Sequence, residues 1–286
     1  MRLEQEKELK LFAAKVRRWA VEGVYNAKSG HPGGSLSCAD VITYLYNAEM
    51  RVDPANPKDP SRDRFVLSKG HCAPALYATL GLKGFFDVNE MKNLRKIDSF
   101  LQGHPCIGAT PGIDMSTGSL GQGISAAVGM AIAGKLDKRD YNVFSVLGDG
   151  EMQEGQVWEA LMSAAHYKLD NLCAFLDNNG LQIDGKVDDV MSLGDVEAKA
   201  AAFGWNVMTI NGHDFNEIEK AVEAFKSHKG EGKPFFVVCK THKGQGVSFM
   251  YDNPGFHGKA PNDEEYKIAV AELDAAIAKA EQEVAS

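Results

Sequence analysis

Five short apolar runs, each bounded by turn residues, recur along the chain. They read RFVLS (64–68), NVFSVL (142–147), NLCAFLDN (171–178), NVMTI (206–210) and FFVVCK (235–240). Between them lie longer stretches with helical spacing, such as EGQVWEALMSAAHYK (154–168) and DFNEIEKAVEAFKSH (214–228). Continuous apolar strands that alternate with helices are typical of a parallel sheet covered on both faces. The pattern therefore predicts an α/β fold with a mainly parallel sheet and helices on both faces.

Helical spacing also marks both ends of the chain, at residues 9–27 and 272–285. The stretch GISAAVGMAIAG (123–134) is apolar on all sides, which predicts a tightly packed interior helix. Residues 181–197 and 243–263 read as long loops, and long loops in compact α/β chains are often functional. Because no linker-like change in composition divides the chain, we expect a single domain over residues 1–286.

Composition excludes several classes of protein. The net charge of −8 argues against a nucleic-acid binder, because a polyanion would be repelled. The charged start MRLEQEKELK has no signal-peptide core, and no apolar run is long enough for a membrane span. Five scattered cysteines, never spaced as C-x-x-C, argue against a disulfide framework or zinc site. We therefore expect a cytoplasmic protein that binds neither nucleic acid nor membrane.

An acidic glycine turn, GDGEMQEGQVWE (148–159), directly follows one of the predicted strands. Asp149 would lie at the carboxyl edge of the sheet, where open α/β sheets bind ligands. Gly148 and Gly150 let the backbone approach a ligand closely, and the start of the following helix attracts anions. A carboxylate beside an anion is repulsive unless a divalent cation lies between them. Mg²⁺ suits this position, because it takes carboxylate and phosphate oxygens together.

A second polar turn, DNNGLQIDG (177–185), ends the next strand, about thirty residues after the GDG turn. Adjacent parallel strands would bring it to the same edge as Asp149. The amide oxygen of Asn179 and a backbone carbonyl just beyond it would then extend the oxygen cage. Asp-Asn-Asn-Gly alone is typical of an ordinary turn. Its pairing with GDG at the ends of two strands favours a metal and diphosphate site.

Four of the eight histidines stand beside Gly or Pro in predicted loops: His31, His71, His104 and His257. A single loop histidine is usually structural or exposed. Four of them, together with a metal and diphosphate site, indicate a shared cleft. The other histidines (His166, His213, His228 and His242) are not assigned to this cleft. His242 follows a strand, from which it could approach the cleft.

The combination of GDG with N-N about thirty residues later is the thiamine diphosphate signature, and the string from 148 to 185 resembles transketolase. The resemblance implies that the chain forms one thiamine diphosphate-binding domain. It implies thiamine diphosphate and Mg²⁺ as cofactors, with Ca²⁺ as an alternative metal. Asp149, Asn179 and the backbone carbonyl of Leu181 would bind the metal, and Gly150 would contact the diphosphate.

The four loop histidines also match transketolase positions, and the resemblance implies a role for each. His71 would contact the diphosphate, and His104 would bind a hydroxyl of the donor substrate. His31 and His257 would face the substrate and assist proton transfer, with His257 also near the diphosphate. Transfer of a two-carbon ketol unit requires groups that move hydroxyl protons near neutral pH, which suits imidazole.

The string MSTGSLGQGISAAVGMA (115–131) resembles the loop and helix of the family that contact the cofactor. The carbonyl of Gly118 would face the aminopyrimidine, and Leu120 would lie against the thiazolium ring. Ser119 is a departure, since most transketolases carry proline there. The contacts implied for this loop are made by backbone atoms and do not depend on that proline.

Glu151 and Glu154 both read as glutamates of a first helical turn, favoured by the helix dipole. The resemblance places Glu154 near a dimer interface, in a carboxylate network that links two active sites and shares protons. Glu154 therefore joins the predicted catalytic and cofactor-binding residues, and Glu159 is a further candidate for the network.

The resemblance covers only the diphosphate-binding half of a transketolase. The family activates its cofactor with a glutamate from a second domain, contributed across a dimer interface, and only a short tail follows His257. The chain is therefore predicted to be the N-terminal subunit of a split transketolase, inactive alone. Its partner would be a C-terminal subunit carrying the pyrimidine-binding domain, in a two-plus-two heterotetramer. Together they would move a two-carbon ketol unit between sugar phosphates.

Other interpretations remain open. A split transketolase-like enzyme could act on a different ketose or sugar-derived substrate, because much of the discrimination lies in the partner. Deoxyxylulose-phosphate synthases share the GDG and N-N elements but differ around them. A dinucleotide turn is disfavoured because the spacing G-x-G-x-x-G is absent. A non-catalytic scaffold subunit is disfavoured by the presence of Asp149, Asn179 and all four loop histidines.

Overall fold

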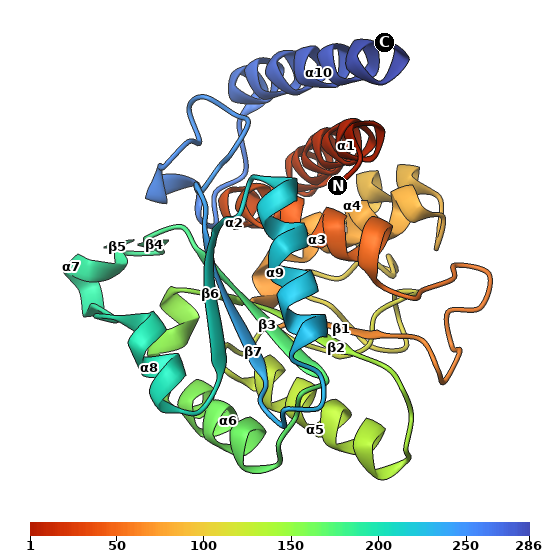
Figure 1. The fold of residues 1–286 in the computed structure, drawn as a ribbon. Coiled ribbons are helices and arrows are strands. Elements are labelled where there is room, and N and C mark those ends of the chain that lie inside the picture. Colours follow the sequence, from red (N-terminus) through yellow and green to blue (C-terminus); the bar gives the residue numbers. More distant parts are fainter.

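The computed structural model describes residues 1–286 and contains a five-stranded, fully parallel sheet (Figure 1). Its strand order is β1-β2-β3-β7-β6. The strands are β1 (Arg64–Leu67), β2 (Val143–Gly148), β3 (Leu172–Asn178), β7 (Phe235–Lys240) and β6 (Asn206–Asn211). All five correspond to the apolar runs of the sequence. The predicted fold class, a mainly parallel α/β sheet, is confirmed.

Helices cover both faces of the sheet (Figure 1). One face packs against α5 (Gln122–Leu136), α6 (Gly155–His166) and α8 (Val196–Ala202). The other packs against α3 (Ala39–Tyr44), α4 (Ala73–Lys83), α9 (Phe215–Ser227) and the long α1 (Leu3–Ala27). Helix α10 (Asp263–Ala285) lies outside this sandwich, against α1.

Shorter elements connect the layers. They are α2 (Pro32–Ser37), α7 (Val187–Met191), the hairpin strands β4 (Leu181–Gln182) and β5 (Gly185–Lys186), a π-helical turn (Leu45–Glu49) and four 3₁₀ turns (Gly70–Cys72, Val88–Asn93, Gly150–Gln153, Pro254–Phe256). Residues 181–197, predicted as a loop, therefore contain a small hairpin and a helical turn. No helix is both long and apolar enough to cross a membrane.

The sheet is apolar on both faces because alternate residues of each strand point to opposite sides. On β2, Phe144 and Val146 join the core under α9 and α1, whereas Val143 and Leu147 join the core under α5 and α6. All four are fully or almost fully buried. Burial of each such side chain stabilises the fold by about 1.5–3 kcal/mol. This double-sided burial explains why the strands read as continuous apolar runs.

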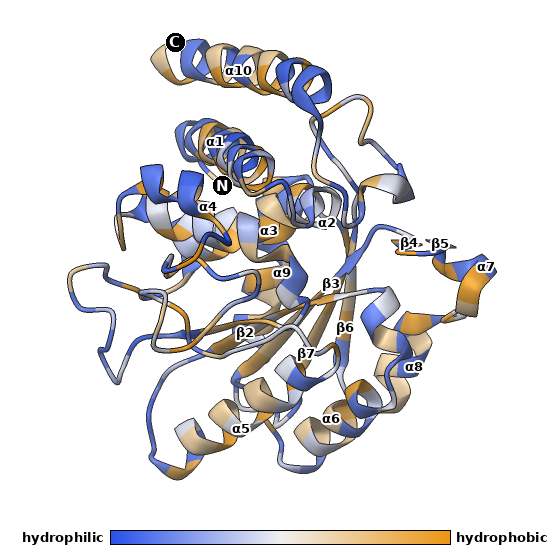
Figure 2. Cartoon of the chain, turned by 180° about the vertical axis from the view of Figure 1, so that it is seen from behind, coloured by the Kyte–Doolittle hydropathy of each residue, from blue (hydrophilic) through white to orange (hydrophobic).

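The prediction that 123–134 forms an interior helix is wrong for one side of α5. Its inner side packs on the sheet through Ile124, Ala127 and Ala131, but Gly129 and Ala133 on its outer side are exposed. Leu136, two residues beyond the predicted stretch, is 76% exposed. On neighbouring α6, Met162 is 57% exposed. The hydropathy colouring shows the apolar character of both helices (Figure 2). An apolar composition on all sides leads to full burial only when another element or another subunit packs on the outer side of the helix.

The strand register brings the polar turns together. Gly148 at the end of β2 lies opposite Asp177 on β3, and Asp177 lies opposite Cys239 on β7. The segments that leave the sheet here are therefore neighbours: residues 68–71 after β1, 149–154 after β2, 179–181 after β3 and 241–243 after β7. This carboxyl edge is where the candidate site lies.

Candidate active site

A cavity of about 320 Å³ opens at the carboxyl edge of the sheet. Its volume suits a small cofactor. Eight residues predicted from the sequence line it: His71, Leu120, Asp149, Gly150, Glu154, Asn179, Leu181 and His257. The structure thus brings together side chains from segments that are far apart in the chain.

Asp149 is a buried carboxylate at the junction of β2 and β3. One oxygen accepts a hydrogen bond from Gly150 N at 2.8 Å, and the other accepts one from Gly180 N at 2.5 Å. Burial raises the pKa of Asp149 to about 6, and the nearby carboxylate of Asp177 acts in the same direction. A buried carboxylate held by two backbone N–H groups, with a second carboxylate beside it, is suited to receive a cation.

The raised pKa of Asp149 leads to a prediction on stability. Its ordinary value is 3.8, so the folded chain holds a proton that the unfolded chain releases between about pH 4 and 6. The quantity to compare is the free energy of unfolding of the metal-free wild type minus that of Asp149→Asn. This difference should fall as the pH rises from about 4 to 6, and at pH 7 it should be lower than at pH 4 by about 2–3 kcal/mol. Denaturant unfolding in the presence of a chelator measures this difference. A wild-type minus Asp149→Asn difference that is the same at pH 4 and pH 7 would contradict the prediction.

Asn179 and Leu181 line the same cavity as Asp149 and offer further oxygen atoms there. The amide nitrogen of Asn179 donates to Ser37 Oγ at 3.3 Å and to Asp177 Oδ2 at 3.2 Å. Its amide oxygen therefore faces the turn, where Leu181 N donates to it at 3.1 Å. Carboxylate, amide and carbonyl oxygens are the ligands that Mg²⁺ and Ca²⁺ prefer. The residues present therefore fit a divalent metal.

Two buried lysines, Lys69 and Lys243, also line the cavity, and the sequence analysis missed both. Each side chain is only 2% exposed. Lys69 forms an ion pair with Asp177. Lys243 Nζ lies 3.1 Å from the carbonyl of Leu181 and 3.1 Å from His257 Nδ1. Burial lowers the pKa of Lys243, and neighbouring Lys69 lowers it further.

The signal for these lysines was present in the sequence. Lys69 and Lys243 each come a few residues after a predicted strand, as Asp149 does. The rule that selected Asp149 for the carboxyl edge therefore selects the lysines as well. Two ammonium groups in a cavity of this size provide positive charge for an anionic ligand such as a diphosphate.

The carboxylate of Asp177 connects several segments at this edge of the sheet. Its carboxylate accepts hydrogen bonds from the hydroxyls of Ser37 and Thr241 and from the amide of Asn179, and it pairs with Lys69. These groups belong to α2 and to the ends of β7, β3 and β1. Asp177 therefore orients Asn179 and Lys69, and the sequence analysis treated it only as part of a turn.

The four loop histidines form one cluster, and two of them, His71 and His257, line the cavity. The ring centre of His31 lies 5.2 Å from that of His71, 5.4 Å from that of His257 and 6.3 Å from that of His104. His71 and His257 stack at 5.1 Å. Nδ1 of His31 is buried and has no hydrogen-bond partner. Because buried polar atoms are normally paired, this nitrogen indicates a place for a ligand atom.

Three histidines of the cluster, His31, His104 and His257, have lowered pKa values. Burial, with the ammonium of Lys243 next in effect, lowers the pKa of His257 to about 3. Burial, followed by neighbouring His71, lowers the pKa of His31 to about 4. The pKa of His104 is also lowered, mainly by burial. At neutral pH these imidazoles can each accept one proton and donate another.

The loop that carries Gly118 and Leu120 packs closely on the histidine turn. Gly118 has φ +137°, and a Cβ there would lie 2.7 Å from the ring of His104. A Cβ on Gly70 would lie 2.6 Å from the backbone nitrogen of Gly118. Gly118 is favoured by its positive φ and by the His104 ring, and Gly70 is favoured because the backbone of Gly118 lies against it.

The three glutamates of the GDGEMQEGQVWE segment lie in different environments. Glu154 is exposed at the rim of the cavity, where it precedes α6, and Glu159 is exposed on α6 itself. Glu151 is buried, and its carboxylate accepts hydrogen bonds from Ser68, Gly121 and Gly148. Glu151 lies in the first turn of the 3₁₀ helix Gly150–Gln153, as the sequence predicted, but its burial was not predicted.

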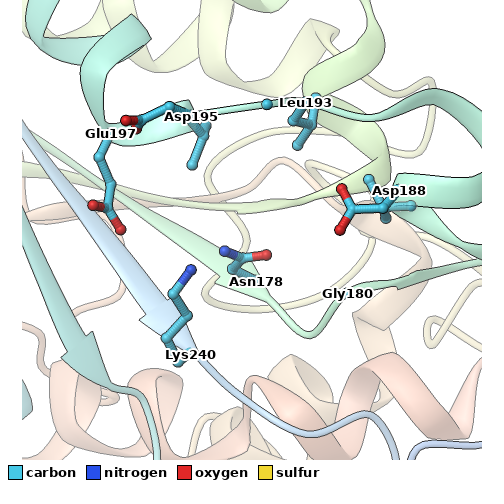
Figure 3. Close-up of a pocket in the computed structure, with 10 residues that line it drawn as sticks. Asn178, Gly180, Asp188, Leu193, Asp195, Glu197 and Lys240 are labelled. Carbon is cyan, nitrogen blue, oxygen red and sulfur yellow. The ribbon is translucent and has the colours of Figure 1, made fainter.

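A neighbouring cavity of about 350 Å³ lies beyond the end of β3 (Figure 3). Asp188, Asp195 and Glu197 line it with Lys240 and Asn178, so its charge is predominantly negative. An anionic diphosphate would be repelled there, which favours the cavity with the two buried lysines. His242 lies outside the histidine cluster, since it is exposed and lies 3.0 Å from a carboxylate oxygen of Asp252.

Comparison with known proteins agrees with this geometry. The family described as "Transketolase, thiamine diphosphate binding domain" matches residues 9–279. The chain belongs to this family of thiamine diphosphate-dependent transferases, and the resemblance drawn from the sequence is confirmed.

Two similar proteins match it along nearly their whole length, and each is named as one subunit of a transketolase. One belongs to the apulose-4-phosphate transketolase of Phocaeicola vulgatus and is 46% identical over 98% of each chain. The other is "6-deoxy-6-sulfo-D-fructose transketolase subunit SqwG" of Clostridium sp., 45% identical over 95% of this chain and 98% of that protein. The chain thus has the extent of a transketolase N-terminal subunit.

Solved transketolases share the fold but are longer. The transketolase from Campylobacter jejuni superposes with a TM-score of 0.84 at 32% identity, covering 96% of this chain but 48% of that one. The chain therefore spans about half the length of the solved enzyme.

Proposed function

We propose that this chain is the diphosphate-binding subunit of a split transketolase, active only with a C-terminal subunit that carries the pyrimidine-binding domain. The observation that carries the proposal is the single cavity that gathers backbone and side-chain oxygens, two buried lysines and the histidines His71 and His257. Glycines let the backbone come close to a ligand, the lysines supply ammonium groups, and Asp149 supplies a buried carboxylate with a raised pKa. Together these features suit a diphosphate bound through a metal. Two relatives of the same extent are named as subunits, which supports a partner chain.

Asp149, Asn179 and the carbonyl of Leu181 would hold Mg²⁺, with Ca²⁺ as the alternative. Gly150 and His71 would contact the diphosphate, with Lys69 and Lys243 as the nearby cations. Gly118 and Leu120 would meet the rings of the cofactor. When bound, thiamine diphosphate supplies a carbon nucleophile and an electron sink.

The histidines would bind the substrate and move its protons. The ammonium of Lys243 donates to Nδ1 of His257, so the ring proton of neutral His257 lies on Nε2. His257 would therefore meet a substrate hydroxyl through Nε2, beside the unpartnered Nδ1 of His31. His104 would bind a donor hydroxyl. Glu154, exposed at the cavity rim, would join the carboxylate network between active sites, with Glu159 next to it on α6.

The substrates would be sugar derivatives with an anionic group. The names of the two similar proteins describe a ketose phosphate in one case and a sulfo-substituted fructose in the other. We therefore propose two candidate reactions. One is transfer between ordinary sugar phosphates, and the other is transfer from a modified ketose that bears a phosphate or a sulfonate. Comparison of the two donor types on one assembled enzyme distinguishes them.

The outer side of α5 and α6 would bind the C-terminal subunit. Both helices begin at the cavity, where Gln122 and Gln156 hydrogen-bond to each other. From there the surface continues to the exposed side chains of Met162 and Leu136. A partner seated on this surface would reach the cofactor and would cover the apolar side of α5. A two-plus-two heterotetramer would contain two such contacts.

Met162→Glu is expected to prevent assembly with the C-terminal subunit while the chain still folds. A carboxylate on the proposed interface would have to be buried without a partner, which costs several kcal/mol. Ile268→Glu is the matched control, because Ile268 is exposed on α10, far from α5 and α6 (Figure 1). Size-exclusion chromatography with light scattering measures assembly. Normal assembly of Met162→Glu would place the interface elsewhere.

Calorimetric titration of the assembled complex with thiamine diphosphate and Mg²⁺ tests the cofactor assignment. Saturable, metal-dependent binding at one site per chain supports it. A folded, assembled complex that binds no cofactor would instead favour the scaffold interpretation.

A further inference from the structure

Glu151 is a buried carboxylate that the cofactor assignment leaves without a role. It follows the GDG turn, and its side chain lines the cavity while the residue is only 2% exposed. One carboxylate oxygen accepts hydrogen bonds from Ser68 Oγ at 2.5 Å and from Gly121 N at 3.0 Å. The other accepts from Gly148 N at 3.0 Å. No lysine or arginine supplies any of these hydrogen bonds.

The three donors belong to three separate segments of the candidate site. Gly148 opens the GDG turn after β2, and Ser68 follows β1 just before Lys69 and His71. Gly121 directly follows Leu120 at the start of α5. One carboxylate therefore connects the proposed diphosphate turn to the proposed ring-contacting loop.

The contact between the loop and the end of β1 is close, so a small displacement of either would be transmitted. Ser68 Oγ also accepts from Ile124 N at 3.0 Å, in the first turn of α5. A Cβ on Gly123 would lie 2.6 Å from Ser68 Cα. Hydrogen bonds to an ionised carboxylate are about twice as strong as neutral ones. Glu151 thus forms the polar part of a tightly packed junction.

We propose that Glu151 is a positioning residue for the cofactor, holding the loop of Gly118 and Leu120 in register with the GDG turn. It acts through the backbone of Gly121 and Gly148. The inference rests on the proposed function, because it assumes that the two segments bind opposite ends of thiamine diphosphate. A ligand that spans both segments needs their spacing, whereas a ligand that contacts only the GDG turn does not.

Asp63 provides a matched control at the opposite end of the same two strands. It is also 2% exposed, and it accepts from Arg51 N at 2.7 Å and Asn142 N at 2.8 Å. Unlike Glu151, it also forms an ion pair with the guanidinium of Arg51 at 3.2 Å. Asp63 precedes β1 and Asn142 precedes β2, so this carboxylate joins the amino ends of the strands that Glu151 and Ser68 join at the carboxyl ends. Loss of either carboxylate should destabilise the fold, but only Glu151 lies at the cavity.

The test compares Glu151→Gln with Asp63→Asn in the assembled complex, using Mg²⁺–thiamine diphosphate and Mg²⁺–pyrophosphate as separate ligands. A glutamine must turn its amide NH₂ toward one of the three donors, which separates the segments. Glu151→Gln should weaken thiamine diphosphate binding about 10- to 100-fold, the usual effect of removing support behind a ligand-binding group. Pyrophosphate binding should change much less. Asp63→Asn should lower the thermal midpoint while leaving both affinities close to wild type.

Each outcome is decisive. Equal weakening of both ligands by Glu151→Gln, or no weakening of either, would overturn the positioning role while leaving the cofactor assignment intact. A wild-type complex that binds no thiamine diphosphate would overturn the proposed function as well. If Glu151→Gln does not fold, Ser68→Ala decides, because it removes one donor and leaves Gly121 and Gly148 in contact. It should then weaken thiamine diphosphate selectively, and unchanged binding would contradict the inference.

Discussion

Replacement of Asp149 by asparagine is expected to weaken Mg²⁺-dependent binding of thiamine diphosphate by the assembled enzyme by at least about 100-fold. Even residues that only support metal ligands cost about 10- to 100-fold when removed, so loss of a ligand's charge should cost more. Asparagine keeps the shape of the side chain but cannot accept hydrogen bonds from Gly150 and Gly180 through both of its terminal atoms. It also removes the negative charge that attracts the metal.

The matched control is Asp188→Asn, which removes a carboxylate from the neighbouring acidic cavity (Figure 3). Its cofactor affinity should equal that of the wild type. Isothermal titration at fixed Mg²⁺ concentration measures both variants. An Asp149→Asn complex that retains wild-type affinity would exclude Asp149 as a metal ligand.

Replacement of His257 by alanine is expected to lower kcat/KM for ketol transfer by about 100- to 10,000-fold, the range for loss of a general acid or base. Affinity for the cofactor should fall less than kcat/KM, by at most about 100-fold, because one hydrogen bond to a charged diphosphate is worth about 1.5–3 kcal/mol. His257 has this effect because it is neutral, oriented by Lys243 and packed against His31 and His71.

His242→Ala is the control for His257→Ala, because His242 also follows the last strand but lies outside the histidine cluster. Steady-state kinetics of both variants, together with cofactor titrations, separates catalysis from binding. Unchanged turnover of His257→Ala would remove His257 from the catalytic residues. An equal loss of turnover and cofactor affinity would reduce its role to binding.

Much of the fold followed from local pattern. The five strands read as apolar runs because both faces of the sheet are covered, and their parallel order brings every strand end to one edge. The proximity of Asp149 and Asn179 was predictable for that reason, since adjacent strands place Gly148 opposite Asp177. Neighbouring glycine or proline marked the four histidines as loop residues.

The rest depended on tertiary contacts. Lys69, Lys243 and Glu151 are buried charges. The sequence shows that each follows a predicted strand, but it does not show that they are buried, because a charged residue in a turn is normally exposed. Their burial is stabilised by partners far away in the chain, such as Asp177 for Lys69 and Ser68 for Glu151. The apolar stretch 123–134 predicted an interior helix, and its sequence did not reveal that Gly129 and Ala133 lie on an exposed side of α5.

The most direct test uses this chain as bait in its source lysate, followed by co-purification with the captured chain. The complex and the chain alone are then assayed for thiamine-dependent conversion of xylulose 5-phosphate plus ribose 5-phosphate, and for transfer from sulfonated ketoses. A split transketolase predicts turnover only when a captured C-terminal subunit, cofactor and metal are all present. Turnover by the chain alone would contradict the need for a partner. An assembled, cofactor-loaded complex with no ketol transfer from any of these donors would contradict the proposed reaction.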